Sequence, residues 1–251
     1  MNWRLIDTGI NTGSYNMQFD LNLAKDVKPE SAILRLYRWS PYCISLGANQ
    51  DIKEINSEKA AADGIDIVKR PTGGRAILHS EELTYSVVMY LESGSSPRNI
   101  YEQINFALIE GLKLYNPELN QLELEVHQPN LPSFYKENIG AACFGVPAKS
   151  EIKFAGKKLV GSAQRKLGSV LLQHGSIMCG DFHVNLAEYL NLNKNESDSV
   201  KKELNNKTTE LESILNIETD YDQLAISIAE GFENFFRVQL FREELISHND
   251  L

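Results

Sequence analysis

Three cysteines are the first candidates for chemistry in this sequence, and one of them stands apart. Cys143 lies in a turn-like run of small residues, Gly-Ala-Ala-Cys-Phe-Gly, where a substrate could approach its thiol. Most lone cysteines are buried and behave as small hydrophobic residues. We give that interpretation to Cys43, which lies in a predicted strand, and to Cys179, which ends one.

A second candidate is the stretch 69–79, Lys-Arg-Pro-Thr-Gly-Gly-Arg-Ala-Ile-Leu-His. The adjacent Gly73 and Gly74 let the backbone approach a ligand closely, and Arg70 and Arg75 add positive charge. The alternative is a Gly-Gly hairpin turn with two solvated arginines, and the stretch alone does not decide between them. It is neither a Walker A loop, which would end in Gly-Lys-Ser/Thr, nor a dinucleotide-binding GxGxxG motif.

A third candidate is the stretch 156–164, Gly-Lys-Lys-Leu-Val-Gly-Ser-Ala-Gln. Its three consecutive small residues, 161–163, indicate that something packs closely over a strand. Lys157 and Lys158 point to opposite faces of such a strand, so at most one of them faces a pocket. The alternative is a hairpin with solvent-exposed lysines.

His174 is the fourth candidate, because it lies beside a glycine at the end of a predicted strand, in the run Leu-Gln-His-Gly-Ser. It could act as an acid or base. A core histidine with satisfied hydrogen bonds is the commoner case, and we favour it here. His127, His183 and His248 have no such context.

The periodicity of apolar residues predicts the elements that must position these groups. Strands are expected over residues 3–7, 33–39, 43–47, 65–69, 83–91, 122–126, 152–154, 158–163 and 170–175, and helices over 14–25, 57–63 and 97–115. Residues 43–47 should form a hairpin with 33–39, and residues 158–163 with 152–154. Strands in hairpin runs with interspersed helices predict an α+β fold, with largely antiparallel or mixed sheets and flanking helices.

Length and composition predict a single domain. The 251 residues contain no repeat, low-complexity tract or linker, so we expect one domain over residues 1–251. The composition changes near residue 181, and the segment 181–251 is expected to be helical. One of its helices should begin at Thr209, with Glu212 completing a capping box.

Charge and cysteine usage exclude several classes of function. The formal net charge of -9 argues against nucleic acid as the main partner, because phosphate binding needs a cationic surface. No stretch approaches the roughly twenty apolar residues that span a bilayer, and no signal sequence follows the first methionine. Three cysteines without a CxxC pair fit a reducing compartment and no zinc site. We therefore expect a cytoplasmic protein without membrane contact or a metal.

These stretches, in this order, resemble the LipM-type octanoyltransferases of the biotin/lipoate protein ligase superfamily. Residues 70–75, followed by His79 and by Glu-Leu-Thr-Tyr-Ser at 82–86, are similar to that family's lipoyl-pocket motif. Two departures are visible: Lys69 stands where an arginine is usual, and Ser80 stands where an aspartate is common. The first keeps the charge, and the second puts only a local hydrogen bond in doubt.

The remaining stretches extend the resemblance to the rest of the family's motifs. Cys143, with Pro147 and Glu151 after it, resembles the nucleophile segment. Residues 156–164 and 172–176 resemble the next two motifs. Each motif alone is modest, but their joint order and spacing are a strong signal.

The resemblance implies a catalytic domain like that of the biotin and lipoate ligases, and an acyl transfer without a cofactor. An octanoyl group would move from acyl-carrier protein to a lysine of a lipoyl domain, such as the glycine cleavage H protein or a dehydrogenase E2 subunit. The implied catalytic pair is Cys143, which would carry the octanoyl group as a thioester, and Lys158. The implied substrate-binding residues are Arg70, Gly73, Gly74, Arg75, His79, Gly161, Ser162 and Ala163.

Two roles stay open for Lys158 under this resemblance. An ordinary cysteine has a pKa near 8.5 and is only about 3% thiolate at pH 7, so a nearby cation that lowers it by about one to two units raises the thiolate fraction roughly tenfold or more. Lys158 could be that cation and also hydrogen-bond the developing oxyanion. A neutral Lys158 could instead accept a proton from the incoming amine.

The protein partners implied by the resemblance are acidic, so a positive patch is expected on this acidic protein. The candidates for it are Arg70, Arg75, Lys157, Arg165 and Lys166. For Arg165 and Lys166 an ordinary solvated turn is equally expected. Nothing in the sequence specifies an oligomer, and a monomer is the default.

Other readings stay open beside carrier-protein-dependent transfer. The ATP-dependent lipoate–protein ligases resemble the chain at the Gly-Gly and Gly-Lys-Lys stretches but lack a cysteine at position 143. An amidotransferase that moves octanoyl between two lipoyl-bearing proteins also uses a cysteine. A non-catalytic module that holds acyl groups is a third reading. We favour transfer from acyl-carrier protein.

Overall fold

The computed structural model describes residues 1–124 and 151–243. Cys143, His127 and His248 therefore lie outside the described residues, as do the last two residues of the predicted strand 122–126.

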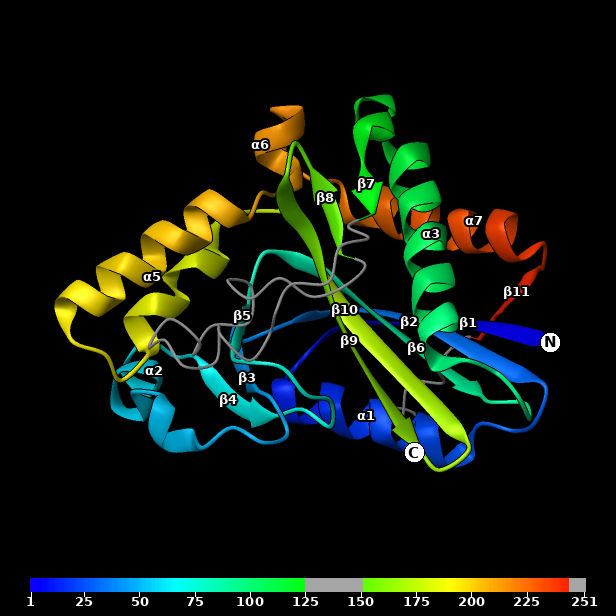
Figure 1. Cartoon of the computed structure of the whole chain (residues 1–251), viewed down its shortest axis with the longest axis horizontal. Coiled ribbons are helices and arrows are strands. Elements are labelled where there is room, and N and C mark those ends of the chain that lie inside the picture. The colour runs from blue at the N-terminus through cyan, green and yellow to red at the C-terminus, as the bar shows by residue number, and fades with distance from the viewer. Residues whose placement is uncertain (125–150, 244–251) are drawn as a thin grey trace, which may run out of the picture.

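Strands and helices are interspersed along the chain (Figure 1). The strands are β1 (Asn2–Asn11), β2 (Ser31–Trp39), β3 (Cys43–Leu46), β4 (Asp66–Lys69), β5 (Ile77–His79), β6 (Glu82–Tyr90), β7 (Glu123–Leu124), β8 (Ile152–Phe154), β9 (Lys157–Leu167), β10 (Val170–Met178) and β11 (Leu240–Arg242). The helices are α1 (Gly13–Asp26), α2 (Ser57–Ala62), α3 (Pro97–Tyr115), α5 (Lys194–Lys207), α6 (Leu211–Leu215) and α7 (Tyr221–Phe236), with 3-10 helices at Ile52–Glu54, Pro117–Gln121 and Phe182–Tyr189.

A large mixed sheet forms the centre of the described structure, in the strand order β11-β1-β2-β6-β10-β9-β8-β7. Strand β1 runs parallel to β11 and β2, and every other neighbouring pair in this sheet is antiparallel. The expected α+β fold with largely antiparallel, mixed sheets is confirmed, as is the hairpin of β8 and β9.

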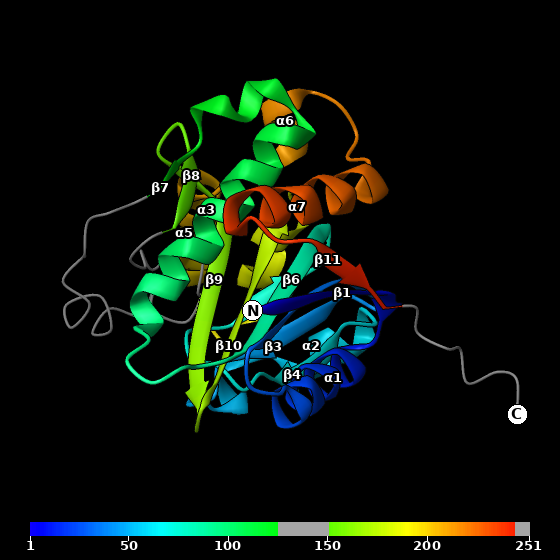
Figure 2. The same cartoon turned by 90° about the vertical axis from the view of Figure 1, so that its right-hand side faces the viewer.

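Helices cover both faces of the large sheet (Figure 2). On one face, Leu34 and Leu36 pack into a core with the apolar sides of α3 and α7. On the other, Ile33 packs against α1. Arg35 shares the α1 face and is fully buried, so the alternation along β2 separates two covered faces rather than a buried face from a wet one.

A small sheet, in the order β4-β3-β5, packs beside the large one with α2, α5 and the 3-10 helix Phe182–Tyr189 (Figure 1). The predicted hairpin of residues 43–47 with 33–39 is therefore wrong. Strand β2 lies between β1 and β6 and has no free edge, so β3 pairs instead with β4 and β5.

The alternative of a hairpin turn at Gly73 and Gly74 is also wrong, because β3 lies between β4 and β5, the two strands that such a turn would pair. Residues 70–76 therefore connect two strands that are not neighbours and pass the end of β3. A connection of this kind must be held by tertiary contacts, since no ladder of hydrogen bonds joins the two strands that it links.

The chain after Gly180 is mainly helical, as expected, but it also contains β11, which pairs in parallel with β1. The predicted capping box is wrong. Helix α6 begins at Leu211 without a side-chain cap, because Thr209 N donates to Lys158 O and Glu212 N donates to Cys179 O. Within the two described ranges, no helix is both long and apolar enough to cross a membrane.

Candidate active site

The segment 70–75, called the Gly-Gly loop here, is organised by the side chain of Arg70. Its Nη2 donates to Gly73 O at 2.9 Å and to Arg75 O at 2.6 Å, and its Nη1 donates to Ser45 O at 2.7 Å. Arg70 is only 2% exposed. Its guanidinium group therefore hydrogen-bonds backbone carbonyl groups and is not part of a positive surface patch.

The loop also lies directly on the backbone that follows β3. Ala48 N donates to Thr72 O at 2.9 Å. A Cβ atom on Gly47 would lie 2.0 Å from Gly74 O, so no other residue fits there without a shift. Gly74 has a φ of +96°, a conformation that L side chains rarely adopt. Gly47 is a constraint that the sequence motif did not indicate.

His79 connects Arg70 to a buried carboxylate through a chain of hydrogen bonds. Its Nδ1 lies 2.8 Å from Glu82 Oε1, and its Nε2 lies 2.7 Å from Ser45 Oγ. Because an ionised carboxylate only accepts, Nδ1 donates to Glu82, and Nε2 is hydrogen-bonded to the Ser45 hydroxyl. Ser45 Oγ in turn accepts from Arg70 Nη1 at 3.1 Å. The His79 ring also stacks on Trp39, with ring centroids 4.0 Å apart.

Glu82 is held in its charged form although it is buried. Burial alone would raise its pKa, but the neighbouring His79 and the hydroxyl donors Thr84 and Ser176 outweigh that effect and lower the pKa below its usual value. Both nitrogens of His79 are therefore engaged, and the predicted pocket residue His79 acts here as a link between the loop and the large sheet.

His174 holds the loop from the other side. Its Nε2 lies 2.6 Å from Thr72 Oγ1, and its Nδ1 lies 3.6 Å from Asp20 Oδ2. Burial lowers the pKa of His174. Burial alone would raise the pKa of Asp20, but His174 and Arg35 outweigh it and lower the pKa. The interpretation of His174 as a buried histidine with partners is confirmed.

The predicted small residues of β9 divide between two faces of the sheet. Gly161 pairs with Ser176 and Ala163 pairs with His174, so both share the face on which His174 contacts the Gly-Gly loop. The Ser162 hydroxyl lies on the opposite face, 2.6 Å from the Tyr85 hydroxyl. The structure thus brings Gly161 and Ala163 to the loop, but not the Ser162 side chain.

Lys158 is buried, whereas Lys157 is exposed, which confirms that the two lysines point to opposite sides of β9. Lys158 Nζ lies 2.6 Å from Glu151 Oε1, and both side chains are at least 95% shielded from solvent. A hairpin with two exposed lysines is therefore wrong. Glu151 appeared in the sequence only as part of a motif, and nothing there indicated that it would pair with Lys158.

A β-bulge sets the direction of Lys158. Ile152 pairs with Val160 and Lys153 pairs with Lys158, so Leu159 is an extra residue on β9. Bulges of this kind bend a strand and change the direction of a side chain beside an active site. The regular alternation of side chains between the two faces of β9 is therefore interrupted between Lys158 and Gly161.

The candidate positive residues do not form one patch. Lys157 and Arg165 are exposed but lie near opposite ends of β9, roughly 25 Å apart at the usual rise of a strand. Arg165 Nη1 donates to Pro71 O at 2.5 Å, and Arg75 Nη1 lies 3.4 Å from Glu54 Oε2. The expected solvated turn at Arg165 and Lys166 is also wrong, since both belong to β9.

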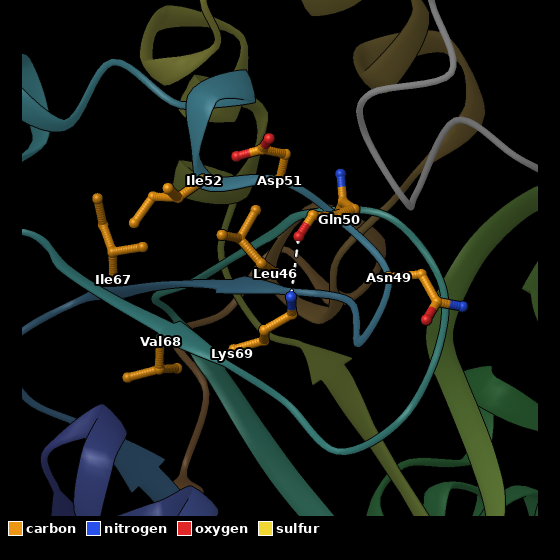
Figure 3. Close-up of a pocket in the computed structure, with 8 residues that line it drawn as sticks. All are labelled: Leu46, Asn49, Gln50, Asp51, Ile52, Ile67, Val68 and Lys69. Carbon is orange, nitrogen blue, oxygen red and sulfur yellow. Dashed lines mark hydrogen bonds between the residues drawn. The ribbon is translucent and has the colours of Figure 1, made fainter.

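A pocket of about 520 Å³ opens beside the start of the Gly-Gly loop (Figure 3). Its lining is Leu46, Asn49, Gln50, Asp51, Ile52, Ile67, Val68 and Lys69. Lys69 Nζ donates to Gln50 O at 3.1 Å across it (Figure 3). None of the predicted substrate-binding residues lines this pocket.

The described cysteines are unsuited to act as nucleophiles. Cys43 and Cys179 are fully buried. Burial raises the pKa of both thiols, that of Cys179 to about 12. In residues 1–124 and 151–243, no group of three or more His, Cys, Asp or Glu side chains could hold a metal ion.

This arrangement of two sheets is the fold of the lipoate protein ligases. The bipartite lipoate protein ligase of Thermoplasma acidophilum superposes with a TM-score of 0.77 over 98% of this chain and 88% of that chain, at 17% identity. That similarity concerns the fold alone.

Sequence comparison gives the family. Residues 12–233 match the lipoyl protein ligase A/B catalytic domain. The octanoyltransferase LipM of Clostridioides difficile (strain 630) is 32% identical over 98% of this chain and 91% of that protein. The octanoyltransferase LipM of Bacillus subtilis (strain 168) is 30% identical over 97% of this chain and 89% of that protein. The chain belongs to the lipoyl protein ligase A/B catalytic-domain family, among its LipM-type octanoyltransferases.

Proposed function

We propose that this octanoyltransferase takes octanoyl from acyl-carrier protein and passes it to a lysine of a lipoyl domain through a thioester on Cys143. The observation that most supports the proposal is the buried Lys158–Glu151 pair, with its 2.6 Å separation. It supplies an amine in a water-poor site, in the hairpin that follows the Cys143 segment in sequence. A ligase that uses ATP would leave Cys143 without a task.

In the first step, the Cys143 thiolate attacks the thioester carbonyl of the donor. A new C–S bond forms, the bond to the phosphopantetheine sulfur breaks, and that sulfur takes up the proton that Cys143 released. One thioester replaces another, so the step is nearly isoenergetic and needs no ATP. Lys158 is the group proposed to favour the thiolate or to hydrogen-bond the oxyanion.

In the second step, the neutral amine of the acceptor lysine attacks the octanoyl-Cys143 carbonyl. An amide C–N bond forms, the C–S bond breaks, and the released cysteine sulfur takes up the proton that the amine loses. An amide is more stable than a thioester, so this step drives the overall transfer.

The octanoyl chain has about seven carbons beyond its carbonyl, and burial at about 0.8 kcal/mol per CH₂ contributes on the order of 5 kcal/mol to its binding. Such a chain needs a slot without bulky side chains. Gly161 and Ala163, which have little or no side chain, are the residues proposed to line it, on the face of β9 that also carries the Gly-Gly loop. His79, His174 and Arg70 would then fix the loop at the edge of that slot.

The test is a transfer assay with octanoyl-acyl-carrier protein and a lipoyl domain, without ATP. The wild type should modify the lipoyl domain, and Cys143→Ala should lower the rate by at least a thousandfold, because the nucleophile is gone. Transfer by Cys143→Ala at the wild-type rate would contradict the proposal. Modification that requires free octanoate or lipoate and ATP would instead identify a ligase, and transfer only from an octanoylated lipoyl domain would identify an amidotransferase.

A further inference from the structure

We infer that Glu151 is a positioning residue that keeps Lys158 in its charged ammonium form and fixes its place, so that Lys158 acts as a cation and not as a resting base. This inference rests on the proposed function and selects between two roles that the sequence leaves open for the lysine. It is carried by the geometry of the pair and by its burial.

The two charged groups depend on each other because both are buried. Nζ and Oε1 are 2.6 Å apart, and the side chains are 5% and 3% exposed. A lone ammonium in such a place would lose its proton, and a lone carboxylate would gain one, because burial disfavours either charge. An opposite charge in contact reverses both tendencies, so the carboxylate holds the proton on the lysine.

The surroundings reinforce the need for Glu151. Among the described residues, Tyr101 of α3 is close enough for the charge of Glu151 to act on it, and Lys153 pairs with Lys158 across the hairpin. Burial raises the pKa of Tyr101, so it is neutral at physiological pH and does not stabilise an ammonium as an anion would. Lys153 is a like charge on the neighbouring strand and disfavours a second ammonium. Glu151 is the anion in direct contact with the Lys158 amine, at 2.6 Å.

The backbone fixes the position of the pair. Glu151 directly precedes β8, and Lys158 is the second residue of β9, with a tight turn between the strands. Ala155 and Gly156 both have positive φ in that turn, at +48° and +79°. The bulge at Leu159 and the bond from Thr209 N to Lys158 O hold the lysine backbone as well. A lysine anchored at both its backbone and its amine is a preorganised charge, which is what stabilisation of a thiolate or an oxyanion requires.

The first experiment follows the protonation of Lys158 itself. The protein is labelled with ¹³Cε-lysine, and the Lys158 signal is assigned by its loss in Lys158→Arg. In the wild type this signal should keep the shift of an ammonium through neutral pH, and in Glu151→Gln it should titrate at least one pH unit lower. A neutral amine in the wild type at pH 7, or the same titration in both proteins, would overturn the inference whatever the reaction is.

The second experiment measures the rate of octanoyl-enzyme formation in a single turnover. Glu151→Gln should lower the maximal rate at least tenfold with little change in the donor concentration that gives half of it, and Glu151→Asp, which keeps the charge, should recover part of the loss. Glu188→Gln is the matched control, because Glu188 pairs with Lys201 at the exposed surface and should leave the rate unchanged.

The two experiments separate the failure of the inference from the failure of the proposed function. A wild type that forms no octanoyl-enzyme refutes the proposed function, while the titration of Lys158 still decides the role of Glu151. Equal maximal rates for Glu151→Gln and the wild type would overturn the positioning role.

Discussion

The two buried histidines of the site are alike in their partners. His79 has Glu82 on one ring nitrogen and Ser45 on the other, and His174 has Asp20 near one and Thr72 on the other. His79 thus links the carboxylate of Glu82 in β6 to Ser45 in β3. His174 links the carboxylate of Asp20 in α1 to Thr72 in the Gly-Gly loop. Two such links give the loop a fixed shape without regular secondary structure of its own.

The pKa of His174 makes the stability of the protein depend on pH. Burial holds the pKa values of His174 and His183 below the ordinary 6.5, so the folded protein keeps both rings neutral while the unfolded chain takes up protons. Below about pH 6.5 the unfolded state binds more protons, so the free energy of unfolding falls as the pH falls, by up to about 1.4 kcal/mol per pH unit for each histidine. The depressed carboxyl pKa values of Asp20 and Glu82 add their effect only at more acidic pH.

The variant His174→Gln tests this link, because glutamine can keep a hydrogen bond to Thr72 but does not titrate. Denaturant unfolding of wild type and variant between pH 7.5 and 5 should show a shallower fall of the unfolding free energy in the variant, by up to about 1.4 kcal/mol per pH unit. Parallel curves would show that His174 is not neutral in the folded protein.

At the residue scale, the sequence singled out polar side chains that the fold buries, but did not indicate what each one contacts. The motifs pointed to Arg70, His79 and Lys158, and all three are buried groups with polar partners. They did not indicate that Arg70 binds carbonyl groups of its own loop, because backbone acceptors leave no trace in the sequence. Ser45 was not predicted as part of the site, because a serine in an apolar strand does not indicate which side chain it contacts.

At the element scale, the positions of most strands and helices followed from apolar periodicity, but their partners did not. Alternation in residues 33–39 and 43–47 is the same whether the two strands pair or belong to different sheets. What decides is that β1 and β6 occupy both edges of β2. Strands β5 and β11 were missed because three residues are too short for a periodic pattern, and β8, which is equally short, was predicted only as the partner of β9 in a hairpin.

A substitution at Gly47 tests the contact between the Gly-Gly loop and the backbone that follows β3. A Cβ there would meet Gly74 O at 2.0 Å, so Gly47→Ala must displace the Gly-Gly loop from β3. We expect the free energy of unfolding to fall by about 1–3 kcal/mol, as in other overpacked sites, with weaker binding of the octanoyl donor. Denaturant unfolding and the donor KM measure the two effects.

Gly73→Ala is the matched control for stability, because an added Cβ at Gly73 meets no atom of the described residues within 4 Å. Its unfolding free energy should stay within about 0.5 kcal/mol of the wild type. A Gly47→Ala protein as stable as Gly73→Ala would show that the loop does not rest on this contact.

At the scale of the whole molecule, the Gly-Gly loop lies where the two sheets meet. It leaves β4 of the small sheet, rests on the end of β3, and contacts His174 on β10 of the large sheet. The large sheet is rigidly held between α1 on one face and α3 with α7 on the other. A substrate slot at this junction would therefore be defined by both sheets, which explains why its residues come from distant parts of the chain.

The intact mass of the enzyme after mixing with octanoyl-acyl-carrier protein, without any acceptor, tests the central claim most directly. The account predicts that the wild type gains one octanoyl group that hydroxylamine removes, and that Cys143→Ala gains none. An unmodified wild type that still transfers octanoyl, or an equal gain of mass by Cys143→Ala, would contradict it.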